Sequence, residues 1–189
     1  MARPKSEGKR KAIMEAAIRV FAERGITDAP TSAISKAAGV SEGSLFTYFK
    51  TKEELMNELY LEFRKEFGAQ VAAMPRGGDV RTRIRRIWDK YLEMGTAQPE
   101  RLRVQSRLRA SGKLFKENEA PNPAILGLLE TAREAVGGSD LHGASPEYLL
   151  LVMRTHAETA IEYIAAHPES RDECWEWGFR ILWKGLAGK

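Results

Sequence analysis

Apolar residues recur at helical spacing along almost the whole chain. One clear set occurs at intervals of four residues, namely Leu55, Leu59, Phe63 and Phe67. This spacing places side chains on a single face of an α-helix, whereas a half-buried strand would alternate apolar and polar residues. No segment shows convincing alternation of that kind. The pattern therefore predicts an all-α protein of about nine helices.

Glycine, proline and capping residues indicate where these helices begin and end. Long helices are predicted over residues 7–24, 51–73, 79–95, 124–136, 145–167 and 169–186, with another that begins near Pro99. Asp79 and Ser145 can cap their helices by accepting backbone N–H bonds. Gly25 follows the first helix, where the chain must leave helical geometry.

The stretch from Thr31 to Leu55 predicts two short helices joined by a glycine turn. The first short helix buries a narrow stripe that includes Ile34 and Ala38, and one of its first two residues can cap it. Gly39 follows at a position that favours left-handed backbone geometry. The small alanine side chains allow another helix to approach closely.

The second short helix has a clear inner and outer face. Ser41 can cap it, and Leu45 and Phe49, four residues apart, point inward. The outer face is left with Glu42, Gly43, Ser44, Thr47 and Tyr48. Short polar side chains on an exposed helix suit close approach to base edges and phosphates. The arrangement is typical of a helix-turn-helix DNA reader.

The residues from Ala38 to Leu55 resemble the signature of the TetR family of transcriptional regulators. The resemblance extends upstream to Ile13 and so covers about the first third of the chain. It implies that small residues of the second short helix face DNA and that Lys52 lies beside a phosphate. Thr47 departs from the family, because many relatives carry an aromatic residue there.

The predicted DNA-binding residues come from both short helices and the start of the next one. They are Thr31, Ser32, Ser41, Glu42, Gly43, Ser44, Thr47, Tyr48, Lys50 and Lys52.

Positive charge is concentrated at the N-terminal end. The net charge is +4, yet residues 1–52 hold ten Lys/Arg against five Asp/Glu, which leaves one excess negative charge in residues 53–189. Neutralisation of DNA phosphates requires such an excess. We therefore predict a DNA-binding domain over residues 1–52. The resemblance implies that residues 53–189 form a helical effector-binding and dimerisation domain, connected to the first by the helix at 51–73.

Composition argues against several other classes of protein. The single cysteine, Cys174, cannot form an internal disulfide, and a buried apolar role is favoured over oxidant sensing. No signal peptide or membrane span is recognisable, so a cytoplasmic location is expected. His142, His156 and His167 lack metal-binding partners nearby, and no phosphate loop or nucleophile motif occurs. Neither catalysis nor a cofactor is therefore expected.

The resemblance further implies a homodimer formed by the last two helices. The residues expected at that interface are Val152, Thr159, Tyr163, Trp175, Phe179, Leu182 and Leu186. Trp177 and Ile181 lie on other faces of the final helix. The alternative is that these residues pack in the core of a monomer.

The helices between the two ends are expected to enclose a ligand pocket. Its candidate residues are mainly aromatic and apolar: Trp88, Tyr91, Met94, Leu108, Phe115, Tyr148, Met153 and His156. For each of them ordinary core packing is the alternative, and His156 can bond either a ligand or a carbonyl.

Together these features predict a ligand-responsive homodimeric repressor. A small hydrophobic or aromatic effector would release it from a palindromic operator by changing the separation of the two recognition helices. The alternative keeps the DNA-binding fold but places it under the control of a protein partner or of abundance alone.

Overall fold

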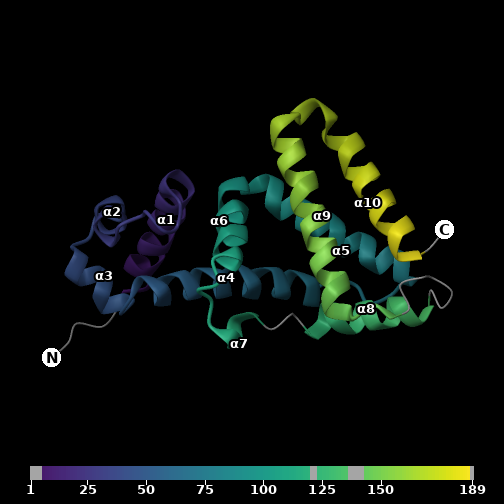
Figure 1. Ribbon diagram of the computed structural model, residues 1–189, viewed down its shortest axis with the longest axis horizontal. Helices are drawn as coiled ribbons and strands as arrows, with labels where there is room; N and C mark the ends of the chain where they lie inside the picture. The colour runs from purple at the N-terminus through teal and green to yellow at the C-terminus, as the bar shows by residue number, and fades with distance from the viewer. Residues whose placement is uncertain (1–5, 120–122, 136–142, 188–189) are drawn as a thin grey trace. The chain divides into compact units, whose positions relative to one another are not determined.

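The computed structural model describes residues 6–119, 123–135 and 143–187. Within these ranges every regular element is a helix, so the all-α prediction is confirmed (Figure 1). The α-helices are α1 (Glu7–Arg24), α2 (Thr31–Ala37), α3 (Glu42–Tyr48), α4 (Lys52–Ala72), α5 (Val80–Ala97), α6 (Pro99–Ala110), α7 (Lys116–Glu119), α8 (Pro123–Ala135), α9 (Pro146–Ala166) and α10 (Arg171–Ala187). A 3₁₀ turn, η2 (Pro168–Ser170), precedes α10.

Helix ends follow the capping chemistry in most places. Asp79 accepts the backbone N–H of Thr82 at 2.8 Å, and Ser145 accepts that of Tyr148 at 3.2 Å. Gly25 adopts a φ of 80°, in the left-handed region that favours glycine. The predicted cap of α2 is wrong, because Pro30 occupies that position and provides no side-chain bond.

The chain forms two compact units. The first unit contains residues 1–63 and 100–120, and the second contains residues 64–99 and 121–189. The first unit thus includes α6 and α7, which lie within residues 53–189, the predicted effector-binding and dimerisation domain. The uninterrupted helix α4 contributes residues to both units.

A continuous apolar core fills the first unit. It is built from Ile13, Ala17, Phe21, Ile34, Leu45, Phe49, Leu55, Leu59, Val104, Leu108 and Leu114. Each helix of the unit from α1 to α4 contributes at least one side chain, so the short helices α2 and α3 are fixed by burial rather than by length. Isolated helices this short are not stable in water.

The second unit packs α5, α8, α9 and α10 together. Figure 1 shows α9 and α10 as neighbouring antiparallel helices. Trp88 of α5 is buried at their junction, where its ring centroid lies 5.4 Å from that of His156 and 6.5 Å from that of Phe179. None of the described helices combines the length and apolar character that a bilayer-spanning helix requires.

Candidate nucleic-acid interface

The helices α2 and α3 form a compact helix-turn-helix. Ile34 on α2 and Leu45 on α3 are fully buried, and Gly39 between the helices has a φ of 66°. The hydroxyl of Ser41 accepts the backbone N–H of Ser44 at 3.1 Å, which satisfies a free donor at the start of α3. These contacts set the angle at which α3 leaves the turn.

The outer face of α3 carries the small and polar residues predicted there, together with Phe46. Glu42, Gly43 and Thr47 are exposed, and Ser44 is half-buried. A Cβ on Gly43 would meet nothing within 4 Å, so packing within the chain does not require glycine there. The hydroxyl of Thr47 donates to the carbonyl oxygen of Gly43 at 3.0 Å, so it is bonded within α3.

The two short helices are linked at their N-terminal ends. The hydroxyl of Thr31 donates to Glu42 Oε1 at 2.6 Å, which brings the beginning of α2 to the beginning of α3. Ser32, next to Thr31, and Ser41, next to Glu42, are both exposed. The predicted DNA-binding residues at the N-terminal ends of α2 and α3 therefore lie close together.

Tyr48, Lys50 and Lys52 occupy the far end of α3 and the start of α4. The hydroxyl of Tyr48 accepts the backbone N–H of Ser6 at 2.9 Å, which ties the beginning of α1 to α3. Lys50 is exposed. The ammonium of Lys52 donates to the carbonyl of Thr27 at 3.1 Å, and burial lowers the pKa of this lysine, with a smaller contribution from the charge of Lys113.

One exposed residue of α3 was not among the predicted DNA-binding residues. Phe46 is 41% exposed although it is large and apolar. It lies four residues after Glu42 and off the inward stripe of Leu45 and Phe49, so helical spacing alone would have placed it on the outer face.

The predicted ligand-pocket residues are divided between the two units. Leu108 and Phe115 belong to the first unit, where Leu108 is part of the core and Phe115 is exposed. The other six belong to the second unit: Trp88, Tyr91 and Met153 are buried, Met94 and His156 are half-buried, and Tyr148 is exposed.

Three of these residues use their polar groups in bonds within the chain. His156 Nε2 lies 2.9 Å from the carbonyl oxygen of Gly178, the hydroxyl of Tyr91 donates to Glu158 at 3.0 Å, and Trp88 Nε1 donates to the carbonyl of Trp175 at 3.2 Å. The carbonyl alternative for His156 is the one that the structure contains.

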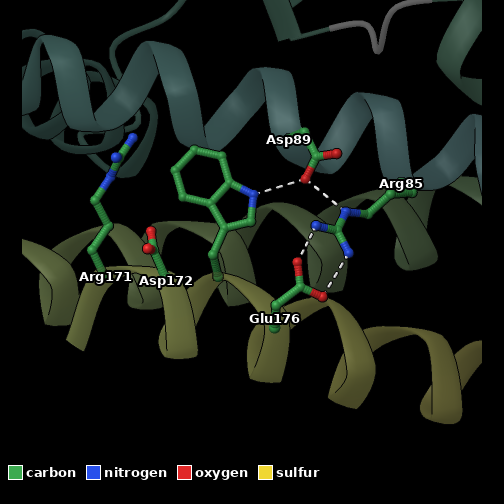
Figure 2. Close-up of a pocket in the computed structure, with 6 residues that line it drawn as sticks. Arg85, Asp89, Arg171, Asp172 and Glu176 are labelled. Carbon is green, nitrogen blue, oxygen red and sulfur yellow. Dashed lines mark hydrogen bonds and ion pairs between the residues drawn. The ribbon is translucent and has the colours of Figure 1, made fainter.

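A charged pocket of about 390 Å³ occurs elsewhere in the second unit (Figure 2). Its lining comprises Arg85, Asp89, Arg171, Asp172, Trp175 and Glu176. Arg85 bonds both carboxylate oxygens of Glu176 and also Asp89, at 2.7 Å in the latter case. The Arg85–Glu176 pair joins α5 to α10, and the charged lining differs from the apolar cavity expected from the sequence.

The expected dimer residues fall into three groups by exposure. Phe179 and Leu182 are buried in the core of the chain itself, so the prediction that they face a partner is wrong for these two. Val152, Thr159 and Tyr163 are exposed on α9, whereas Trp175 and Leu186 are half-buried. The final helix instead exposes Trp177 and Ile181. The stripe at Trp175, Phe179 and Leu182 is the face that α10 turns toward the interior.

Cys174 is buried, and its Sγ lies 3.7 Å from the carbonyl oxygen of Ala160. Burial raises the pKa of this thiol, which disfavours the reactive thiolate. The apolar role expected for this residue fits its surroundings.

Comparison with known proteins matches this architecture. The buried α1, the α2–turn–α3 pair and the start of α4 form a helix-turn-helix domain of the three-helix class. Residues 13–59 match the family model described as bacterial regulatory proteins, tetR family. The N-terminal part of the chain therefore resembles the helix-turn-helix domain of that family.

Curated relatives share the N-terminal part. The chain is 40% identical over 55 residues to a fatty acid metabolism regulator protein of Bacillus subtilis, which is 29% of this chain and 28% of that protein. It is 34% identical over 53 residues to a probable acrEF/envCD operon repressor of Escherichia coli, or 28% of this chain and 24% of that protein. The matches thus span less than a third of these relatives.

Solved structures are similar over almost the full length. A TetR family transcription regulator from Marinobacter aquaeolei has a TM-score of 0.80 at 24% identity, with 95% of each chain covered. The regulator FadR from Bacillus subtilis, solved in complex with stearoyl-CoA, has a TM-score of 0.63 at 15% identity, with 95% of this chain and 98% of that chain covered. At these identities the likeness shows the fold.

Proposed function

We propose that this protein is a sequence-specific DNA-binding repressor of transcription. The outer face of α3 carries the proposal, because Leu45 and Phe49 hold the helix in place while Gly43, Ser44 and Thr47 are left to meet DNA. In this proposal the side chains of α3 contact base edges. The remaining predicted residues, from Thr31 and Ser32 to Lys50 and Lys52, position the domain on the phosphates.

The DNA site is proposed to be a palindrome bound by two copies of the chain. Two-fold symmetry places the recognition helices in major grooves about one helical repeat apart, roughly 34–36 Å. The exposed residues of α9 and α10 supply the proposed contact between the copies. The protein would act in the cytoplasm, where the bacterial chromosome lies.

A substitution at Gly43 tests the DNA-binding face. The target DNA is first selected with the wild-type protein from a library of genomic fragments. Gly43→Leu should then reduce affinity for that DNA roughly tenfold or more, which corresponds to about 1.4 kcal/mol or more, because the new side chain would occupy the space of the DNA backbone. The measurement is a binding titration by fluorescence anisotropy.

The matched control is Gly127→Leu on α8, which is exposed and likewise has no atom within 4 Å of its Cβ. This variant should bind as the wild type does. Unchanged affinity of a folded Gly43→Leu protein would mean that another surface reads the DNA.

We further propose that a small hydrophobic or aromatic effector controls DNA binding through the second unit. The support is the family, together with the neighbouring structure that holds stearoyl-CoA. A ligand that prefers the arrangement unable to bind DNA weakens binding by its differential affinity for the two states. Control by a protein partner or by abundance is the alternative. Thermal shifts with a panel of apolar ligands, a long-chain acyl-CoA among them, distinguish the two, since only an effector both raises the melting temperature and releases DNA.

A further inference from the structure

The segment from Arg101 to Lys116 is unusually basic. It contains six Lys/Arg and no Asp or Glu, and it spans α6 and the turn that leads to α7. Four of these cations are exposed: Arg103, Arg107, Lys113 and Lys116. None of the four forms a salt bridge with a residue that the structure describes. The segment belongs to the same compact unit as the helix-turn-helix.

Part of this basic segment meets Lys52 around Phe21, near the end of α1. The Lys52 ammonium lies 5.9 Å from the centroid of the Phe21 ring, and Arg107 Nη1 donates to the backbone carbonyl of Phe21 at 3.5 Å. The backbone carbonyl of Lys113 accepts from the side-chain amide of Asn57 on α4 at 3.2 Å, and the charge of Lys113 helps to lower the pKa of Lys52. Three cations from α4, α6 and the following turn therefore converge, although 61 positions separate the first from the last in the sequence.

Asn57 fixes the backbone of this turn. Its side chain is 2% exposed and uses its full hydrogen-bonding capacity. The amide donates to the carbonyl of Glu53 at 2.9 Å and to that of Lys113 at 3.2 Å. Its oxygen accepts from the backbone N–H of Phe115 at 2.7 Å and from Asn118 at 2.9 Å. Lys113 is thus held at a defined place beside α4.

Like charges held together on a folded surface repel one another unless an anion joins them. Glu53 and Asp28 act on Lys52 in the opposite sense, but more weakly than burial and Lys113. DNA is the polyanion that the first unit is proposed to bind, and its phosphates are regularly spaced along the duplex. Arg107 Nη1 donates to the carbonyl oxygens of Phe21 and Ala22, near the C-terminal end of α1. A positive charge there also interacts favourably with the helix dipole.

We propose that Lys113 contacts a DNA backbone phosphate beside Lys52, so that the DNA-binding surface extends from the helix-turn-helix onto the turn between α6 and α7. Arg107 adds positive potential at this place, and Asn57 is the positioning residue for Lys113. The inference rests on the proposed DNA binding of the first unit.

The dependence of DNA affinity on salt tests this inference. The probe is a random-sequence duplex of about 30 base pairs, because phosphate contacts do not depend on sequence. Lys113→Gln keeps the backbone carbonyl that Asn57 binds and removes only the charge. The slope of log affinity against log salt should become shallower by about 0.9 for each protomer bound, as for one lost phosphate contact. Between 50 and 200 mM salt, the wild type should then lose about threefold more affinity per protomer than the variant.

Two further variants complete the experiment. Lys65→Gln removes an exposed positive charge of the second unit and should leave the slope unchanged. Asn57→Ala, checked for folding by circular dichroism, should release the turn, so that adding Lys113→Gln causes little further change in slope.

The outcomes separate the two proposals. If the wild type binds no DNA, the proposed function is wrong. If the wild type binds and Lys52→Gln flattens the slope while Lys113→Gln does not, DNA binding stands and the additional contact is rejected.

Discussion

At the scale of single residues, Gly178 explains how closely the helices of the second unit can pack. A Cβ built on this glycine would lie 2.5 Å from Cζ2 and 2.8 Å from Cη2 of Trp88. Trp88 cannot easily move away, since it is buried and its indole N–H donates to the carbonyl of Trp175. The carbonyl of Gly178 also meets His156. One missing side chain thus lets α10 approach both α5 and α9.

Replacing this glycine should therefore destabilise the protein. Gly178→Ala is expected to lower the free energy of unfolding by roughly 1–3 kcal/mol, because added atoms in a packed core force shifts of its neighbours. Gly185→Ala on the same helix should instead raise the free energy of unfolding, by up to about 1 kcal/mol. A Cβ at this position meets no atom within 4 Å, and alanine favours the helix over glycine. Urea denaturation of both variants checks the pair. Equal effects would contradict the close approach at Trp88.

Single residues also show where sequence reasoning works. Ser41, Asp79 and Ser145 were recognised as caps because a cap depends on neighbours within three positions. The need for glycine at position 178 depends on Trp88, which is 90 positions away, and no local pattern contains it. The convergence of Lys52 and Lys113 was missed for the same reason.

At the scale of elements, the link between α5 and α10 combines apolar packing with charge. Arg85 binds Glu176 through two N–H groups (Figure 2). The guanidinium carbon of Arg85 also lies 4.9 Å from the centroid of the Phe179 ring. These bonds lower the pKa of Glu176 below its ordinary value of 4.5. The carboxylate therefore binds its proton more weakly in the folded chain than in the unfolded chain.

This pKa shift predicts how the link depends on pH. A lowered pKa contributes stability above pH 4.5, and the contribution is lost as the pH falls through the folded value. Glu176→Gln should cost up to about 1 kcal/mol at pH 7, a small value because the pair is screened by solvent. The difference from the wild type should shrink below pH 4.5.

Denaturation of both proteins from about pH 3 to about pH 7 measures this effect, because that range lies on both sides of the ordinary carboxyl pKa of 4.5. Glu173→Gln, an exposed residue of the same helix, serves as the control and should change little. A difference that stays constant over the whole range would mean that the charge of Glu176 does not contribute.

The positions of the helices along the chain were largely predictable, whereas the helices against which each one packs were not. The predicted start and end of α1 agree with the structure, because its apolar period and closing glycine are local features. The sequence division at residue 52 left α6 with the C-terminal part, yet Val104 and Leu108 pack into the core of the first unit. An apolar stripe shows that a helix is buried, but it does not show which surface covers it.

The same ambiguity affects the final helix at the scale of the whole molecule. Its regular stripe, which includes Phe179, is covered by the chain itself, and Phe179 is 2% exposed. The less regular residues Trp177 and Ile181 are left at the surface, together with Val152 and Tyr163 of α9. Large exposed apolar side chains gathered on two neighbouring helices are typical of a protein interface. The proposed two-fold contact is therefore better tested at Ile181 than at Phe179.

Two substitutions on α10 should consequently give different results. Ile181→Glu changes a side chain that is 62% exposed in the single chain, so the protomer should fold normally. In a dimer the same charge would be buried without a partner, at a cost of several kcal/mol, and the protein should sediment as a monomer with sharply reduced affinity for its DNA. Phe179→Glu should instead unfold the second unit, which circular dichroism would detect.

Ala69→Glu, which places a charge on an exposed position of α4, is the control and should change neither sedimentation nor DNA binding. Sedimentation velocity, circular dichroism and DNA titration are carried out on the same samples, because monomer formation must be separated from unfolding. A palindromic site needs both copies to place two recognition helices at the right separation. If Ile181→Glu stays dimeric, the copies meet elsewhere. If the wild type itself sediments as a monomer yet binds a palindrome tightly, the dimer mechanism fails.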